Sequence, residues 1–132
     1  MRSGGVLDTS VFIAAESGRR LNEELLPEES AISVVTLAEL HAGVLAAPDT
    51  ETRARRMATV DALGEIEILP VDVAAARLWA QLRVQLAEAG RRININDLWI
   101  AATAASRGLP VVTQNDDFSV LEGMARIAVI RV

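Results

Sequence analysis

The segment Gly5-Val6-Leu7-Asp8-Thr9-Ser10-Val11-Phe12 decides the fold class, because a short apolar run passes directly into a helical pattern. We expect a strand over residues 5–8 and a helix that Thr9 caps and that continues through Ala15. A strand that leads straight into a helix, with an acidic residue at the junction, is typical of proteins that alternate the two elements along the chain.

The same alternation continues to the end of the chain. Strands are expected at 31–33, 66–69, 110–113 and 127–132. Helices are expected at 36–46, 51–63 and 72–89, with a further one that Asn94 or Asn96 caps and that ends at Arg107. Short strands separated by helices indicate a parallel sheet with helices on its faces, so the sequence predicts an α/β fold. At 132 residues the chain is long enough for one domain, which we expect to span 1–132.

The composition removes several classes of chemistry. The chain has no Cys, its 13 basic residues are all Arg, and it has one His, at position 41. Thiolate sites, phosphate loops that need a lysine, Schiff bases and histidine triads are therefore excluded or disfavoured. Carboxylates remain, 18 of them, and the net charge of −5 argues against binding nucleic acid by charge alone. A nuclease whose acids are neutralised by a metal ion is still compatible with that charge.

Neither a secretory signal nor a membrane span is predicted. The N-terminal residues lack a long apolar stretch, and no apolar run reaches the roughly 18 residues that cross a bilayer. We therefore expect a cytoplasmic protein that has no membrane partner.

Several acids occupy positions where surface charge is not expected. Asp8 ends the first strand, and Asp116 and Asp117 follow the strand at 110–113. Ligands of parallel sheets gather at the carboxyl ends of the strands. Glu39 lies in a helix that is apolar on nearly every side and that we expect to be buried all round, while Asp97 heads an apolar stripe.

Each of these acids also has an ordinary structural explanation. Asp8 is in a position to cap a helix. Glu39 can reach an exposed edge beside His41. Asp97 lies in the first turn of its helix, where the helix dipole favours an acidic residue. Taken together, however, acids that converge from four segments repel one another, and a divalent cation relieves that repulsion. Oxygen ligands select a hard ion such as Mg²⁺ or Mn²⁺, and such ions suit phosphodiester hydrolysis.

Four stretches of the sequence resemble the four acidic motifs of the PIN domain, and more narrowly those of VapC ribonuclease toxins. The stretches are Leu7-Asp8-Thr9-Ser10, Thr36-Leu37-Ala38-Glu39-Leu40, Asn96-Asp97-Leu98-Trp99-Ile100-Ala101-Ala102 and Val112-Thr113-Gln114-Asn115-Asp116-Asp117-Phe118. They occur in the family's order and cover essentially the whole chain. The resemblance implies a three-layer α/β/α sandwich around a mainly parallel sheet. It also implies a Mg²⁺- or Mn²⁺-dependent endoribonuclease that is the toxin of a toxin–antitoxin pair.

The resemblance also implies roles for individual residues. Asp8, Glu39 and Asp97 are the core acids, and Asp8 and Asp97 hold the metal most directly. Glu39 and a fourth-motif acid complete the set, either Asp117 or Asp116. The small polar residues beside the acids are implied to support the metal ligands or to contact phosphate: Thr9, Ser10, Thr113 and Asn115.

The implied partners are RNA, a VapB-type antitoxin and a second copy of the chain in a homodimer. Arg91 and Arg92 lie just before the third motif and are our candidates for RNA contact, with a solvated surface pair as the alternative. Arg53, Arg55 and Arg56 form another basic group. The fourth motif departs from the family pattern, since Asn115 stands where many members have an acid. That departure keeps open a rival reading, a catalytically inactive PIN-like module that only binds proteins.

Overall fold

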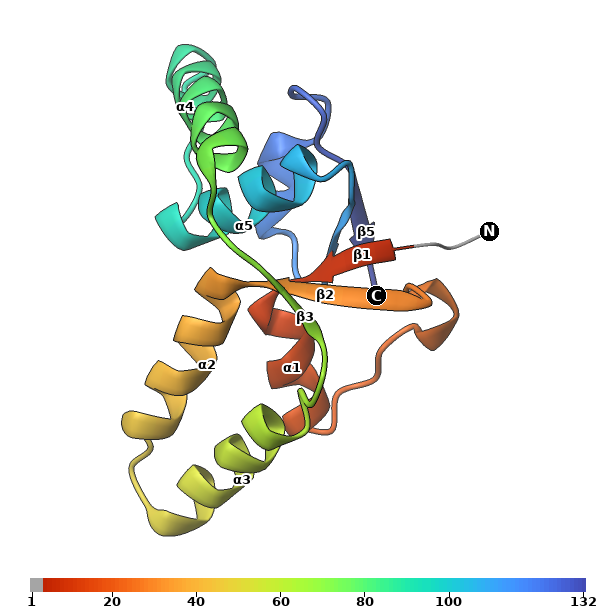
Figure 1. The fold of residues 1–132 in the computed structure, drawn as a ribbon, viewed down its shortest axis with the longest axis vertical. Helices are drawn as coiled ribbons and strands as arrows, with labels where there is room; N and C mark the ends of the chain where they lie inside the picture. Colours follow the sequence, from red (N-terminus) through yellow and green to blue (C-terminus); the bar gives the residue numbers. More distant parts are fainter. Residues whose placement is uncertain (1–3) are drawn as a thin grey trace.

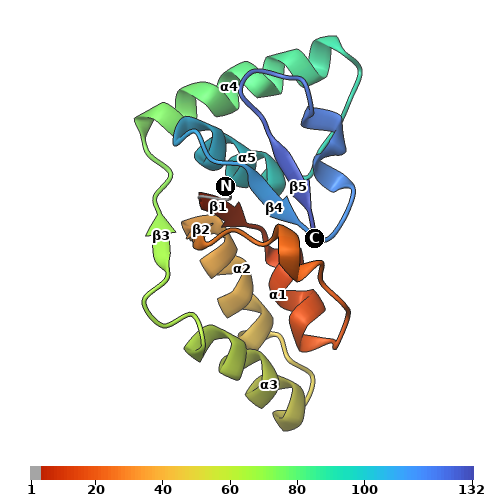
Figure 2. The same ribbon diagram turned by 90° about the vertical axis from the view of Figure 1, so that its right-hand side faces the viewer.

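The computed structural model describes residues 4–132, which form a five-stranded parallel sheet between two layers of helices (Figures 1 and 2). The strands are β1 (Gly4–Leu7), β2 (Glu29–Ser33), β3 (Glu67–Leu69), β4 (Val111–Thr113) and β5 (Val129–Arg131). The helices are α1 (Thr9–Glu16), α2 (Val34–Leu45), α3 (Thr50–Asp61), α4 (Val73–Glu88) and α5 (Ile95–Ser106). Two short 3₁₀ turns, η1 (Glu23–Leu25) and η2 (Asp117–Leu121), complete the elements. The predicted α/β class is confirmed.

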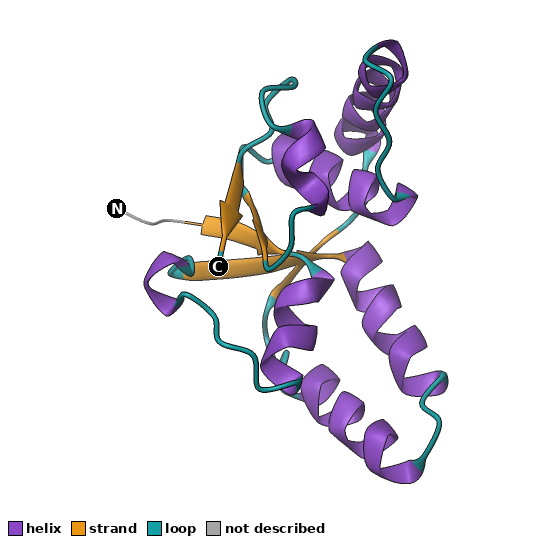
Figure 3. Cartoon of the chain, turned by 180° about the vertical axis from the view of Figure 1, so that it is seen from behind, coloured by secondary structure: helices purple, strands orange, loops and turns teal. Residues whose placement is uncertain are grey.

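The helices segregate to the two faces of the sheet. Helices α1, α2 and α3 lie on one side, and α4 and α5 lie on the other, as the view from behind also shows (Figure 3). Alanines of α5 pack against the sheet and leucines of α4 join them in one core, while Val11 of α1 joins Ile32 and Val112 in the other. Because both faces are covered, the central strands β1 and β4 are largely buried.

The strand order β3-β2-β1-β4-β5 places β1 at the centre, with β2 on one side and β4 on the other. The chain therefore winds outward from β1 in one direction and later returns to wind in the other. The crevice outside the carboxyl ends of the two strands at such a reversal is where ligands bind in open parallel sheets. Here those strands are β1 and β4, and they pair directly through Val6 with Val111 and Leu7 with Val112.

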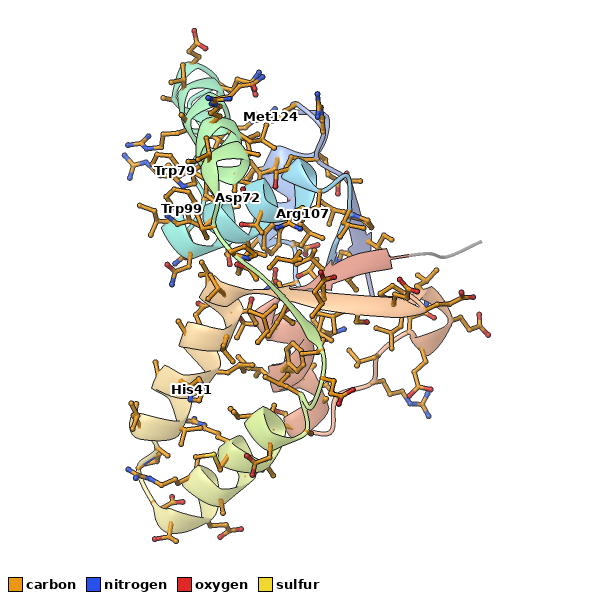
Figure 4. All side chains as sticks on the ribbon, viewed as in Figure 1. His41, Asp72, Trp79, Trp99, Arg107 and Met124 are labelled. Atoms are coloured by element: carbon orange, nitrogen blue, oxygen red, sulfur yellow. The ribbon has the colours of Figure 1, made fainter. Side chains whose placement is uncertain are left out.

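The interior is close-packed around β1 and between helices α4 and α5. A Cβ atom at Gly5 would come within 2.8 Å of Val112 Cγ2, so glycine is required for this close approach. Trp79 of α4 stacks on Trp99 of α5, with ring centroids 4.7 Å apart (Figure 4). Trp99 thus packs between α4 and α5.

Helix ends follow the sequence signals closely, with one correction. Asp49, Asp72 and Asn94 cap α3, α4 and α5, each accepting hydrogen bonds from the first turn. The expectation that Thr9 caps α1 is wrong. Asp8 is the cap, because its backbone is extended and its carboxylate accepts the amide of Ser10, while Thr9 is already helical.

The expectation that α2 is buried all round is also wrong. Only one face of this helix is buried, through Thr36, Leu40 and Val44, whereas Leu45 is 75% exposed. The reason is that α1, α3 and α5 pack on parts of α2 and leave its outer face to solvent (Figure 1).

Helix α4, at 16 residues, is too short to cross a bilayer, and the same holds for every helix within residues 4–132.

Candidate active site

The fold brings four acidic side chains to the carboxyl edge of the sheet. Asp8 directly follows β1, and Asp117 begins η2 after β4. Helix α2 follows β2 and starts at this edge, so that Glu39 lies in its second turn. Helix α5 precedes β4 and therefore also starts at this edge, with Asp97 in its first turn.

Asp8 is the most deeply placed of the acids, at 2% exposure. Its Oδ1 accepts hydrogen bonds from the amide and the hydroxyl of Ser10, and its Oδ2 accepts one from Thr113 Oγ1 at 2.9 Å. Burial raises the pKa of Asp8 above its ordinary value, and the bonds from Ser10 and Thr113 oppose that rise. The carboxylate is thus held in one orientation by side chains of the first and fourth motifs.

Asp97 is surrounded by the other acids. Burial, together with the nearby carboxylates of Asp8, Asp117 and Glu39, raises the pKa of Asp97 to about 7. Like charges act on one another in this way only when they are close together. The carboxylates of the other three segments thus act on Asp97, which also lines a depression together with Asp117.

Glu39 is anchored from two helices. Thr9 Oγ1 of α1 donates a hydrogen bond to its Oε1 at 2.6 Å, and Asn96 Nδ2 of α5 lies 3.4 Å from its Oε2. Sequence analysis selected Thr9 as a supporting residue but missed Asn96, whose place directly before Asp97 was the available signal. His41 lies exposed on the outer face of α2 (Figure 4).

The two acids of the fourth motif, Asp116 and Asp117, have different surroundings. Asn115 Oδ1 accepts the amide of Asp117 at 3.0 Å, and the Asn115 amide in turn lies 3.3 Å from Thr113 Oγ1. This turn places Asp117 beside Asp97. Asp116 lines a surface depression together with Asp97 and Asp117, but its exposed carboxylate pairs with Arg131 of β5.

Ser10, Thr113 and Asn115 thus connect the first and fourth motifs. Besides its bonds to Asp8, Ser10 Oγ accepts the amide of Gln114 at 3.0 Å. Arg131 and Gln114 were not selected from the sequence. Gln114 lies within the fourth motif, whereas no local motif marks Arg131.

The two candidate RNA-binding arginines differ in their surroundings. Arg92 borders a depression of about 360 Å³ together with Asp97 and Asp117. Arg91 instead donates a hydrogen bond to the carbonyl of Val120 at 3.3 Å. Both side chains are exposed, and Arg92 is the one that lies beside the acids.

The donor set fits a hard divalent cation in its chemistry, because it consists of carboxylates without thiolate or imidazole. Within residues 4–132, no three acidic or histidine side chains are yet gathered into a ready-made metal site. The oxygens of Asp8 and Glu39 are instead engaged by the hydroxyls of Ser10, Thr113 and Thr9.

Comparisons with known proteins identify the family of this chain. The family model described as PIN domain matches residues 5–124. The chain is 62% identical to Ribonuclease VapC5 of Mycobacterium tuberculosis over 130 residues, which cover 98% of this chain and 96% of that protein. It is 34% identical to the tRNA(fMet)-specific endonuclease VapC of Shigella flexneri, over 83% of this chain and 85% of that one.

Solved structures give the same relationship. A structure of VapBC-5 from Mycobacterium tuberculosis, described as a member of the VapBC family of toxin-antitoxin systems, superposes with a TM-score of 0.93. That match has 59% identity and covers 98% of this chain and 99% of the other. A chain of DNA-bound VapBC from Salmonella typhimurium has a TM-score of 0.76 and 29% identity, covering 99% of this chain and 98% of the other. The chain therefore belongs to the PIN-domain family, and within it to the VapC ribonucleases.

Proposed function

We propose that the chain is a Mg²⁺- or Mn²⁺-dependent endoribonuclease and the toxin of a VapBC-type toxin–antitoxin pair. The observation that carries the proposal is the convergence of Asp8, Glu39 and Asp117 on Asp97, whose pKa is raised to about 7. Such a concentration of carboxylates is unfavourable by itself and becomes favourable when a cation is bound. The names of the relatives, ribonuclease and endonuclease, support RNA as the substrate.

Asp8 and Asp97 would hold the ion most directly, and Glu39 and Asp117 would complete the set. Ser10 and Thr113 fix the orientation of the Asp8 carboxylate, and Thr9 does the same for Glu39. Ligands held by neighbouring hydrogen bonds keep their geometry when the charge around them changes. When bound, the ion supplies a Lewis acid for the phosphate and lowers the pKa of a water molecule.

Asp117 is the fourth acid in this proposal, in preference to Asp116. The carboxylate of Asp117 acts on Asp97, whereas that of Asp116 is engaged by Arg131. Asn115, which stands where many relatives have an acid, serves instead as the hydrogen-bond acceptor of the turn that positions Asp117. The departure of the fourth motif therefore gives little support to an inactive protein-binding module, since an acid still reaches the group.

The similar solved structures also support a proposal about the partner of this chain. The similar solved structures are toxin–antitoxin complexes, some of them bound to DNA, which supports a VapB-type antitoxin as the partner of this chain. A homodimer and a cytoplasmic location stay predictions from the sequence.

The proposal is tested by RNA cleavage with the purified chain. We expect cleavage with Mn²⁺ or Mg²⁺, none in EDTA, and recovery when the metal is restored in excess. The Asp97→Asn variant should be inactive under all conditions, while Asp116→Asn, which alters an exposed acid outside the group, should retain activity. Cleavage that is equally fast in EDTA, or that survives Asp97→Asn, would contradict the proposal.

A further inference from the structure

A cavity of about 280 Å³ lies between α1, α2 and α3 and opens beside the acids. Thr9 and Glu39, which hydrogen-bond to each other within the acidic group, also line this cavity. The cavity is therefore continuous with the candidate active site on the Glu39 side. The depression beside Arg92 borders other members of the acidic group, Asp97 and Asp117.

Two arginines of α3 give the cavity a basic wall. Arg55 and Arg56 both line it, and Arg56 Nη1 donates a hydrogen bond to the carbonyl of Gly43 at 2.7 Å. That bond holds the Arg56 guanidinium at the cavity wall and leaves other N–H groups for a ligand. A planar guanidinium that is already oriented is suited to bind a phosphate group.

Apart from Glu16, the rest of the lining is apolar or small. Ile13 of α1 is 46% exposed, and Leu40 of α2 lies beneath the cavity surface with 7% exposure. Gly43 contributes no side chain, and a Cβ atom built there would meet only Arg56 Cδ, at 3.9 Å. The cavity is open at this point for lack of a side chain. A planar base can bury one face against such an apolar surface, and the carboxylate of Glu16 at the wall can accept its amino hydrogens.

We propose that this cavity binds the nucleotide next to the scissile phosphate, with its base against Ile13, Leu40 and Gly43 and its outer phosphate on Arg55 and Arg56. The proposal rests on the proposed ribonuclease function, because the scissile phosphate is assigned to the acids. RNA bound in this way passes from the basic wall of α3, across the acidic group, to the depression beside Arg92.

The Gly43→Leu variant tests the base position by filling the cavity. Leucine has the higher helix propensity and no backbone strain is introduced, so folding is not impaired. Ala42→Leu is the matched control, because it adds a similar side chain at the neighbouring, exposed position of α2. Both variants are also made in an Asp97→Asn background, where a fluorescein-labelled oligoribonucleotide can be bound without being cleaved.

We expect Gly43→Leu to raise the Kd of that oligonucleotide by about tenfold or more and to lower kcat/KM for cleavage correspondingly. Ala42→Leu should leave both within about twofold of the parent protein. The affinity for Mn²⁺ should be unchanged in both variants, because neither residue belongs to the acidic group. The Tm should not fall in either variant, because leucine is a good helix former.

Arg55 and Arg53 provide a second matched pair on α3. Both are exposed, and only Arg55 lines the cavity. Arg55→Gln should make the dependence of log K on log salt shallower by about 0.7, the value for one phosphate contact with single-stranded RNA. Arg53→Gln should leave that slope unchanged.

The outcomes separate this proposal from the proposed function. If the parent protein cleaves RNA with Mn²⁺ but Gly43→Leu behaves like Ala42→Leu, the nucleotide cavity is refuted and a protein partner becomes its better occupant. Equal salt slopes for Arg55→Gln and Arg53→Gln would refute the phosphate contact. If the parent protein does not cleave RNA at all, the proposed function fails, and unaltered oligonucleotide binding by Gly43→Leu would then refute the cavity independently.

Discussion

Replacing Asp97 with asparagine should stabilise the metal-free protein, although it removes an acid from the candidate active site. Burial and the carboxylates of Asp8, Asp117 and Glu39 raise the pKa of Asp97 from 3.8 to about 7. The folded state therefore binds a proton more tightly than the unfolded state does. Stability is lost as the pH rises through the window between those two values, and the full cost is present above pH 7.

The size of the effect follows from that difference in pKa. A rise of about three corresponds to roughly 4 kcal/mol at about 1.4 kcal/mol for each pKa unit, which is the ceiling. Asp97 is only partly buried, so solvent screening reduces this figure, and we expect about 1–2 kcal/mol. For a chain of this size that corresponds to a Tm higher by roughly 3–10 °C. Asparagine has nearly the same shape, so no cavity offsets the gain.

The assay is a thermal melt of both proteins in EDTA at pH 8 and at a pH near 4. The variant should melt higher at pH 8, and the difference should shrink at the acidic pH, where Asp97 is protonated in the folded state. With Mn²⁺ at about 100 times its Kd, the wild-type protein gains about 2.7 kcal/mol and the order should reverse.

Asp116→Asn is the matched control for these melts, because Asp116 is exposed and lies outside the acidic group. It should leave the Tm unchanged or slightly lower, since an exposed ion pair with Arg131 is lost. If Asp97→Asn melts lower than the wild-type protein in EDTA at pH 8, then Asp97 stabilises the fold and the placement of the site at Asp97 is refuted.

Three further predictions concern function. Expression of the chain in bacteria should arrest growth and Asp8→Ala should relieve the arrest, whereas equal toxicity in plating assays would count against cleavage as the cause. Asp117→Asn should lower the rate of RNA cleavage by at least about a hundredfold and Asp116→Asn by less than about threefold, and the reverse order in a gel assay would exchange their roles. Arg92→Ala should reduce the salt dependence of RNA binding more than Arg91→Ala does, because only Arg92 borders the depression beside the acids; equal slopes would remove Arg92 from the RNA path.

Much of the fold could be predicted from local patterns. Strand–helix alternation indicated the parallel sheet, and Asp49 and Asp72 marked helix starts because their side chains accept first-turn amides. Solvent exposure was harder to predict. Helix α2 has an apolar outer face, as at Leu45, that no element in residues 4–132 covers, and such a face looks the same in sequence as a buried one.

The candidate site could likewise be predicted only in part. Asp8, Glu39 and Asp97 were selected because an acid at a strand end or on an apolar helix face needs a compensating partner. The choice between Asp116 and Asp117 required the fold, because it depends on Arg131, which lies 15 residues further along the chain. The cavity beside Glu39 also required the fold, since α1, α2 and α3 build it together and Gly43 marks it only by lacking a side chain.

Anomalous diffraction from crystals soaked in Mn²⁺, recorded at the manganese absorption edge, addresses the proposed metal centre itself. We expect an anomalous peak within about 2.0–2.4 Å of carboxylate oxygens of both Asp8 and Asp97, with Asp117 or Glu39 nearby. The peak should be absent from crystals of the Asp97→Asn variant soaked in the same way. A manganese peak bound elsewhere, or none at these acids in the wild-type protein, would contradict the assignment of the metal and of the cleavage reaction that depends on it.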